Sequence, residues 1–183
     1  MLLAQDTLVL LKIQSVRGAY LPNNEEPWQD ANYLLKYSVM GDSVGISGSQ
    51  AHQAVKRLVI SGLIDKEMHV RANAALEWLV HGVKYAFPPV YGGIIRGMPT
   101  SYAAPPLISE IGESGEPPPV WAWAEGTVRG ISLQPIYRTG PMASWRDPHL
   151  YEYLALLDAL RCGRTRETSL AEKFLRQKFG VSS

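Results

Sequence analysis

Apolar residues recur with a helical period in the segment between Gly48 and Ser61. They are spaced three to four residues apart, which predicts one buried stripe along an α-helix. The stripe consists of Ala51, Val55, Leu58 and Val59. The other face is polar and carries Ser49, Gln50, Gln53, Lys56 and Arg57, with His52 at its edge. The pattern therefore predicts an amphipathic helix, which Gly62 ends.

The residues before this helix predict a sharp turn from a shorter helix. Gly45 tolerates positive φ just past the end of a helix near Val44, because it has no Cβ to clash. Ile46 then fills the crevice between the two helices. Ser47 is a good N-cap, and Gln50 three residues later completes a capping-box pattern. The stretch from residue 38 to residue 62 thus predicts a helix-turn-helix.

The run GISGSQAHQAVKRLVISGLI resembles the recognition helix of MarR-like winged-helix transcriptional regulators. The resemblance covers about Leu2 to Ile64. It implies that the second helix lies in the major groove of DNA, with hydroxyl and amide groups near base edges and cations near phosphates. Three helices of this kind also serve in antitoxins and in complexes that bind no DNA, so a packing or protein-binding use stays open.

The N-terminal residues predict the first helix of the same core. Asp6 or Thr7 caps it and Gly18 stops it. Its apolar positions are Leu8, Leu11 and Val16, with Val9, Leu10 and Ile13 beside them. A polar loop over residues 19–30 follows. The next helix begins either at Trp28 or, as we favour, after a break near Lys36.

The segment after Ile64 departs from the family pattern, in which a hairpin follows the recognition helix directly. Here the periodicity predicts a helix from Val70 to His81 with Gly82 as its C-cap. Two β-prone runs come next, Val83 to Phe87 and Ile94 to Met98. They fold either into a ribbon that serves as the wing, with Lys84 and Arg96 on its edges, or into a loop that covers the helical core.

The C-terminal half changes character twice. Residues 99–126 are rich in proline, glycine and glutamate and predict a connector. Residues 127–140 then predict one strand, whose partner is either Ile94 to Met98 or Val120 to Trp123. Asp147 and Pro148 open a helix, Gly163 breaks it, and a final helix follows. These two apolar helices either pair two chains or close the core of their own chain.

The predicted fold is therefore mainly α (α+β). A winged-helix-like tri-helical domain spans residues 1–98, a proline-rich connector with a small β element spans residues 99–146, and a C-terminal helical pair spans residues 147–183.

The net charge of +1 excludes a global attraction to nucleic acid, so binding must use local patches. Lys and Arg outnumber Asp and Glu by six to three over residues 47–98 and by nine to five over residues 129–183. The single cysteine, Cys162, excludes an intramolecular disulfide and fits a reducing cytoplasm. The N-terminus does not match a signal peptide, and no run is long enough to span a membrane.

Catalytic motifs are absent from the sequence. It has no phosphate loop, no HExxH, no dinucleotide glycine pattern and no GxSxG, and its four histidines are scattered over the predicted elements. We therefore expect no enzyme activity, no cofactor and no metal.

The sequence favours a cytoplasmic, homodimeric regulator, most simply a repressor, that binds double-stranded DNA. The predicted contacts are Ser47, Ser49, Gln50, His52, Gln53, Lys56, Arg57, Lys84 and Arg96. The alternative is an antitoxin-like or adaptor protein that mainly binds a protein partner, such as a toxin enzyme, with DNA binding for autoregulation.

Overall fold

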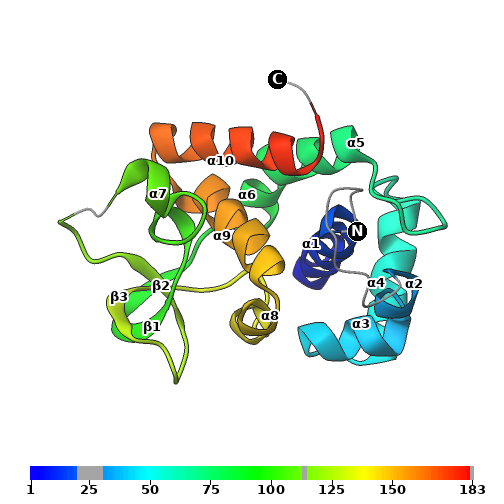
Figure 1. Ribbon diagram of the computed structural model, residues 1–183, viewed down its shortest axis with the longest axis horizontal. Helices are drawn as coiled ribbons and strands as arrows, with labels where there is room; N and C mark the ends of the chain where they lie inside the picture. The colour runs from blue at the N-terminus through cyan, green and yellow to red at the C-terminus, as the bar shows by residue number, and fades with distance from the viewer. Residues whose placement is uncertain (20–30, 113–114, 182–183) are drawn as a thin grey trace.

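The computed structural model describes residues 1–19, 31–112 and 115–181. The predicted polar loop of residues 20–30, including the alternative helix start at Trp28, lies outside the described residues. Within them the chain is mainly helical with a small three-stranded sheet (Figure 1). Its helices are α1 (Ala4–Ala19), α2 (Ala31–Leu34), α3 (Tyr37–Val44), α4 (Gly48–Ile60), α5 (Ala72–Glu77), α6 (Val83–Ala86), α7 (Ile108–Ile111), α8 (Gly140–Arg146), α9 (Pro148–Cys162) and α10 (Thr165–Lys178), with a π-helical turn η1 (Trp78–Gly82) and a 3₁₀ turn η2 (Ser101–Ala103).

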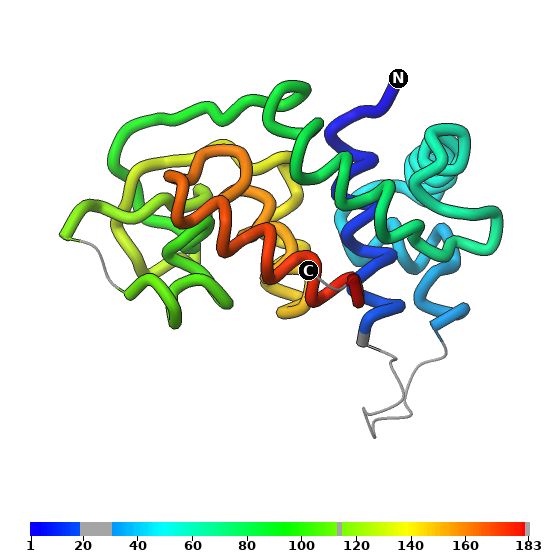
Figure 2. The backbone as a smooth tube through the Cα atoms, turned by 90° about the horizontal axis from the view of Figure 1, so that it is seen from above, coloured from blue at the N-terminus to red at the C-terminus, as the bar shows by residue number. Residues whose placement is uncertain are grey.

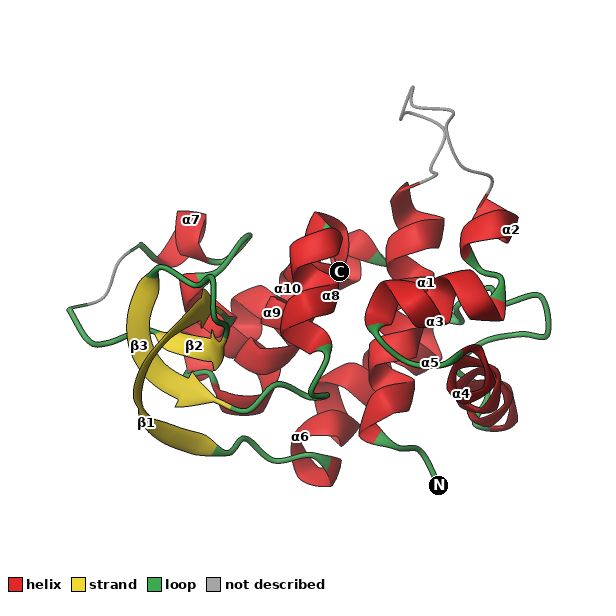
Figure 3. Cartoon of the chain, turned by 90° about the horizontal axis from the view of Figure 1, so that it is seen from below, coloured by secondary structure: helices red, strands yellow, loops and turns green. Residues whose placement is uncertain are grey.

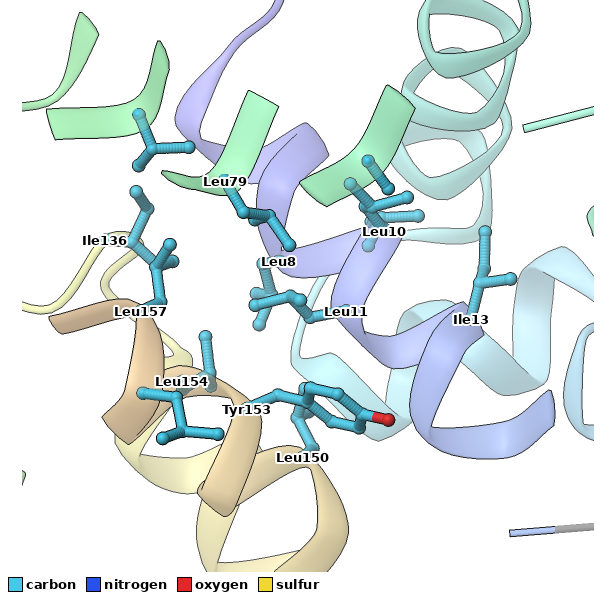
Figure 4. Close-up of a cluster of buried hydrophobic side chains, with 14 of the residues drawn as sticks. Leu8, Leu10, Leu11, Ile13, Leu79, Ile136, Leu150, Tyr153, Leu154 and Leu157 are labelled. Atoms are coloured by element: carbon cyan, nitrogen blue, oxygen red, sulfur yellow. The ribbon is translucent and has the colours of Figure 1, made fainter. Parts of the chain in front are cut away.

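Two central helices, α1 and α9, hold the molecule together. Both are apolar around most of their circumference, which is the pattern of a helix with neighbours on every side. Leu8 and Leu11 of α1 face Leu154 and Tyr153 of α9 in the core (Figure 4). The predicted core positions of the first helix are all buried.

A short sheet and the α3–α4 pair lie at opposite ends of this core (Figure 3). Strand β1 (Tyr91–Pro99) pairs antiparallel with β2 (Pro119–Ala122) and with β3 (Val128–Leu133). Strands β2 and β3 pair parallel, so the three strands close on one another. The strand predicted at residues 127–140 is confirmed only over Val128–Leu133, which form β3, and both of its candidate partner segments contribute to the sheet.

Buried polar side chains fasten the sheet to α9. The Asp158 carboxylate accepts hydrogen bonds from Thr100 Oγ1 at 2.8 Å and Trp121 Nε1 at 2.7 Å, and it pairs with Arg161 at 2.6 Å. Burial raises the pKa of Asp158, while the Arg161 guanidinium and the two hydrogen bonds oppose that effect. Arg161 also donates to the Phe87 carbonyl, so one ion pair connects α9 with residues on either side of β1.

The prediction of a β-strand from Val83 to Phe87 is wrong, because Val83–Ala86 form helix α6. Helical structure runs without interruption from Ala72 to Ala86, through the π-helical turn. Val83 is completely buried, and the gain from burying it against the core outweighs its β propensity. Gly82 is not a C-cap. A Cβ at this position would lie 2.5 Å from the Trp78 ring, so the glycine makes room for that ring.

The C-terminal helices form as predicted but pack within their own chain. Asp147 caps α9 by accepting a hydrogen bond from the Leu150 backbone N–H, and Gly163 follows the last turn. All residues from Tyr153 to Leu160 are buried within the chain. Helix α9 therefore has no apolar face left for contact with a second copy of the protein. Helix α10 runs along α9 at the surface (Figure 2).

The predicted domain boundaries fall within packed structure. The boundary at residue 98 lies inside β1, and the connector region includes two strands and α8. One cluster of buried hydrophobic side chains extends from α1 to α10. Among the described residues, no helix combines the length and apolar character needed to cross a membrane.

Candidate nucleic-acid interface

The turn between α3 and α4 is fixed by two glycines. Gly45 adopts φ 72°, as predicted, and its neighbour Ile46 donates its N–H to the Gly41 carbonyl at 2.9 Å. A Cβ on Gly45 would lie 2.5 Å from Met142 Cε, and a Cβ on Gly41 would lie 2.8 Å from the Ile46 carbonyl oxygen. A larger residue at Gly41 would therefore push α3 away from the start of α4, and one at Gly45 would push this turn away from α8.

The start of α4 is held by the capping box that the sequence predicts. The Gln50 N–H donates to Ser47 Oγ at 3.1 Å, and the Ser47 N–H donates to Gln50 Oε1 at 2.9 Å. Gln5 of α1 also donates to the Gln50 carbonyl at 3.2 Å. The side chains of Ser47 and Gln50 are both exposed, but each already accepts a hydrogen bond from the backbone of the cap.

An ion pair between α1 and α4 sets the orientation of α4 on the core. Arg57 Nε and one terminal nitrogen each lie 2.7 Å from an oxygen of Asp6. The Asp6 side chain is fully buried, and it also accepts the Leu3 N–H that opens α1. The hydrogen bond to Asp6 raises the pKa of Arg57. Arg57 therefore does not project freely toward a phosphate, contrary to its predicted role.

The remaining polar side chains of α4 point away from the core. Ala51, Ala54, Val55 and Leu58 are buried, whereas Val59 of the predicted stripe is only half-buried. The opposite side of the helix is exposed and consists of Ser49, His52, Gln53 and Lys56; we call these four residues the α4 face. The His52 ring contacts the ring of Tyr37 on α3, with centroids 4.9 Å apart.

A short antiparallel hairpin follows α4 directly, where the sequence pattern predicts none. The Arg71 N–H donates to the Leu63 carbonyl at 2.9 Å, the Asp65 N–H donates to the His69 carbonyl at 3.0 Å, and Ile64 pairs with Val70. We call residues 63–71 the post-α4 hairpin.

Two features hold its loop. The Asp65 side chain accepts the N–H groups of Glu67 and His69, and Met68 adopts φ 59°. The hydrogen bond from the His69 backbone lowers the pKa of Asp65. Lys66 is exposed at the tip and Arg71 at the base, so the hairpin presents cations beside α4.

The structure does not bring Lys84 and Arg96 to this surface. Lys84 lies on α6, with its ammonium 5.1 Å from the Tyr85 ring centroid. Arg96 lies on β1, and the sheet is at the end of the molecule opposite to α4 (Figures 1 and 3). The predicted ribbon between them does not form, so neither residue can belong to a wing that extends from α4.

A cleft of about 440 Å³ among the described residues lies between the start of α3 and the post-α4 hairpin, and it is open to solvent. Its lining includes Arg17, Lys36 and Met68. A smaller cleft of about 160 Å³ lies at Cys162 and Tyr91. Burial raises the pKa of the Cys162 thiol, which disfavours the reactive thiolate. Among the described residues, no group of three or more His, Cys, Asp or Glu side chains could hold a metal ion.

Comparison of the chain with protein-family models, curated proteins and solved structures finds no match. The candidate interface is therefore defined by the geometry of α4, of the residues that hold it and of the post-α4 hairpin.

Proposed function

We propose that the protein binds double-stranded DNA, with α4 in the major groove and the post-α4 hairpin as the wing beside it. The observation that supports the proposal is that some residues of α4 hold the helix on the core while others are exposed to solvent. One side is anchored by the capping box and the Asp6–Arg57 pair, and the other side presents the α4 face to solvent. A rigidly held helix with exposed amide, hydroxyl and cationic groups suits base-edge and phosphate contacts.

The contacts divide into two kinds in this proposal. Gln53 is exposed and makes no hydrogen bond with another described residue, so both halves of its amide can pair with an adenine edge. Lys56 of α4 and Lys66 of the post-α4 hairpin are exposed cations for phosphate. Gln50 and Ser47 support the helix instead, because their side chains close the capping box.

A binding titration on random-sequence duplex DNA at several salt concentrations tests the proposal. Removing one cation that neutralises a phosphate lowers the salt slope by about 0.9. We expect Lys56→Ala and Lys66→Ala each to lower the slope by about that amount. The matched control is Lys173→Ala, an exposed cation on α10, which should leave the slope unchanged. Equal salt slopes for the wild type and all variants would show that neither α4 nor the hairpin contacts phosphates.

A regulator in the cytoplasm, most simply a homodimeric repressor, is the role we propose for this activity. The pairing of two chains must use a surface other than α9, whose apolar residues are buried within the chain. Sedimentation at micromolar concentration, with and without duplex DNA, measures the stoichiometry. A monomer under both conditions would rule out the dimer and leave the DNA contact to be tested separately.

Binding of a protein partner is a second candidate, favoured by exposed apolar side chains between α6 and β1. Tyr85, Val90, Tyr91 and Ile94 are each about half or more exposed. Large apolar side chains that are exposed close together in the sequence are candidates for an interaction site. A partner held there would leave α4 free, as an antitoxin-like or adaptor protein with DNA binding for autoregulation requires.

A further inference from the structure

The sheet carries two arginines directly opposite each other. Arg96 on β1 and Arg129 on β3 are Cα partners in the antiparallel ladder, and both side chains are exposed. Neither takes part in any ion pair among the described residues. Like charges in directly opposite positions destabilise a sheet. An anion bound between them would remove that repulsion.

A pair of tryptophans lies next to these arginines. In the antiparallel β1–β2 ladder, Gly97 is the partner of Ala122. The residue before Gly97 is Arg96 and the residue after Ala122 is Trp123, so the register leads from Arg96 to Trp123. Its ring lies 6.3 Å, centroid to centroid, from the ring of Trp145 on α8, with 36° between the planes. Trp145 is 62% exposed. An indole this exposed places a broad apolar surface in water. Its contact with Trp123 connects it to the end of the β1–β2 ladder, where the register leads to Arg96.

The carboxylates closest to Trp123 in the sequence form no ion pair with Arg96 or Arg129 among the described residues. Among the described residues, Glu125 is the acidic side chain of the turn between Trp123 and Gly126, and it is exposed. Glu116, the preceding carboxylate, is paired with Arg164 at 2.9 Å. We name the surface made of Arg96, Arg129, Trp123 and Trp145 the Arg–Trp face.

We propose that the Arg–Trp face binds single-stranded nucleic acid. Arg96 and Arg129 contact the phosphates, and Trp145, supported by Trp123, stacks on a base. The combination of cations that follow a backbone with an exposed aromatic ring is what unpaired bases require. Bases in a duplex are stacked on each other and cannot cover the indole, whereas an acidic peptide would use the arginines and leave the indole exposed.

This site does not depend on the α4 face. The sheet and α4 lie at opposite ends of the molecule in both views (Figures 1 and 3), and no residue belongs to both surfaces. The failure of duplex binding at α4 would therefore leave this proposal intact, and the reverse also holds.

Fluorescence anisotropy of a labelled oligothymidylate, measured with the full chain across a range of salt concentrations, tests the proposal. The double variant Arg96→Ala/Arg129→Ala should bind at least about tenfold more weakly, with a salt slope lower by about 1.4, because each phosphate contact on a single strand contributes about 0.7. Trp145→Ala should weaken binding about 5- to 150-fold and leave the slope unchanged, since stacking releases no counterion. These side chains are exposed, and unchanged far-UV circular dichroism would verify the fold.

One control matches the double variant. Arg166→Ala/Lys173→Ala removes the same charge from exposed positions on α10 and should bind the oligonucleotide as the wild type does. Three results would overturn the proposal: equal weakening by the α10 double variant, a duplex or polyglutamate that binds the Arg–Trp face more tightly than the single strand, or a wild-type chain without affinity for oligothymidylate at low salt.

Discussion

Removing Arg57 should destabilise the fold more than any other change of an α4 cation. The substitution Arg57→Ala leaves the fully buried Asp6 carboxylate without its two 2.7 Å hydrogen bonds. Breaking a buried ion pair from one side costs about 3–5 kcal/mol. Because 27% of the Arg57 side chain reaches solvent, water replaces part of the interaction, and we expect a decrease in stability of about 2–3 kcal/mol.

A double-mutant cycle measures the interaction itself. Asp6→Ala, Arg57→Ala and the double variant are compared by urea unfolding followed by circular dichroism. The double variant should be more stable than the sum of the two single effects implies, by about 1–3 kcal/mol, because the two side chains contact each other directly.

Lys56→Ala is the matched control for this cycle. Lys56 is the preceding residue of the same helix, is exposed and makes no ion pair among the described residues, so its removal should change stability by no more than about 0.5 kcal/mol. If Arg57→Ala is as stable as Lys56→Ala, or if the effects of the Asp6 and Arg57 substitutions add, the Asp6–Arg57 pair does not stabilise the fold. Either result would make Arg57 a candidate phosphate contact again.

Three further changes test the supports of α4 and α9. Gly45→Ala should destabilise by more than about 1–2 kcal/mol in thermal unfolding, since φ is 72° and the new Cβ would meet a methionine Cε at 2.5 Å; Gly93→Ala, with no atom within 4 Å, is the control. Burial alone raises the pKa of Asp147, but Lys12 and neighbouring hydrogen bonds lower it overall, so its stabilisation is complete above the pKa of an unfolded aspartate and is lost as the pH falls. Asp147→Asn should therefore cost more in urea unfolding at about pH 7 than at about pH 3. Gln50→Ala should lower the unfolding temperature by disrupting the capping box and leave base preference unchanged in a site selection.

Local chemistry in the sequence is sufficient to predict the helices around the α4 face. The capping box of Ser47 and Gln50, the positive φ of Gly45 and the Asp147 N-cap depend on residues within four positions of one another. Such contacts form wherever the backbone is helical, so the pattern of a few residues is enough to predict them.

The post-α4 hairpin escapes prediction because its turn has none of the usual signals. The left-handed position is occupied by Met68, where glycine or asparagine is typical, and the loop is held by the Asp65 side chain. Only two or three backbone hydrogen bonds define it. A loop without glycine or proline therefore gives no sequence signal of a turn, and the pattern predicts only the helix that begins at Val70.

The roles of Arg57, Val83 and Arg96 depend on contacts between distant parts of the chain. Asp6 is 51 positions away from Arg57, and Val83 becomes helical because the core buries it. Only the sheet register places Arg96 opposite Arg129. Periodicity within one segment carries no information about these pairings.

Selection of binding sites from a random duplex library tests most directly whether the α4 face recognises DNA. The wild type should enrich one site that contains an adenine. Gln53→Ala should lose the preference at that base pair and keep the preferences at the others. The reason is that one amide contacts the edge of one base, and this contact contributes about 1–3 kcal/mol of discrimination against other bases. Lys56→Ala should enrich the same site as the wild type with lower affinity. A wild type that enriches no sequence, or a Gln53→Ala variant with preferences identical to the wild type at every position, would contradict this assignment of α4.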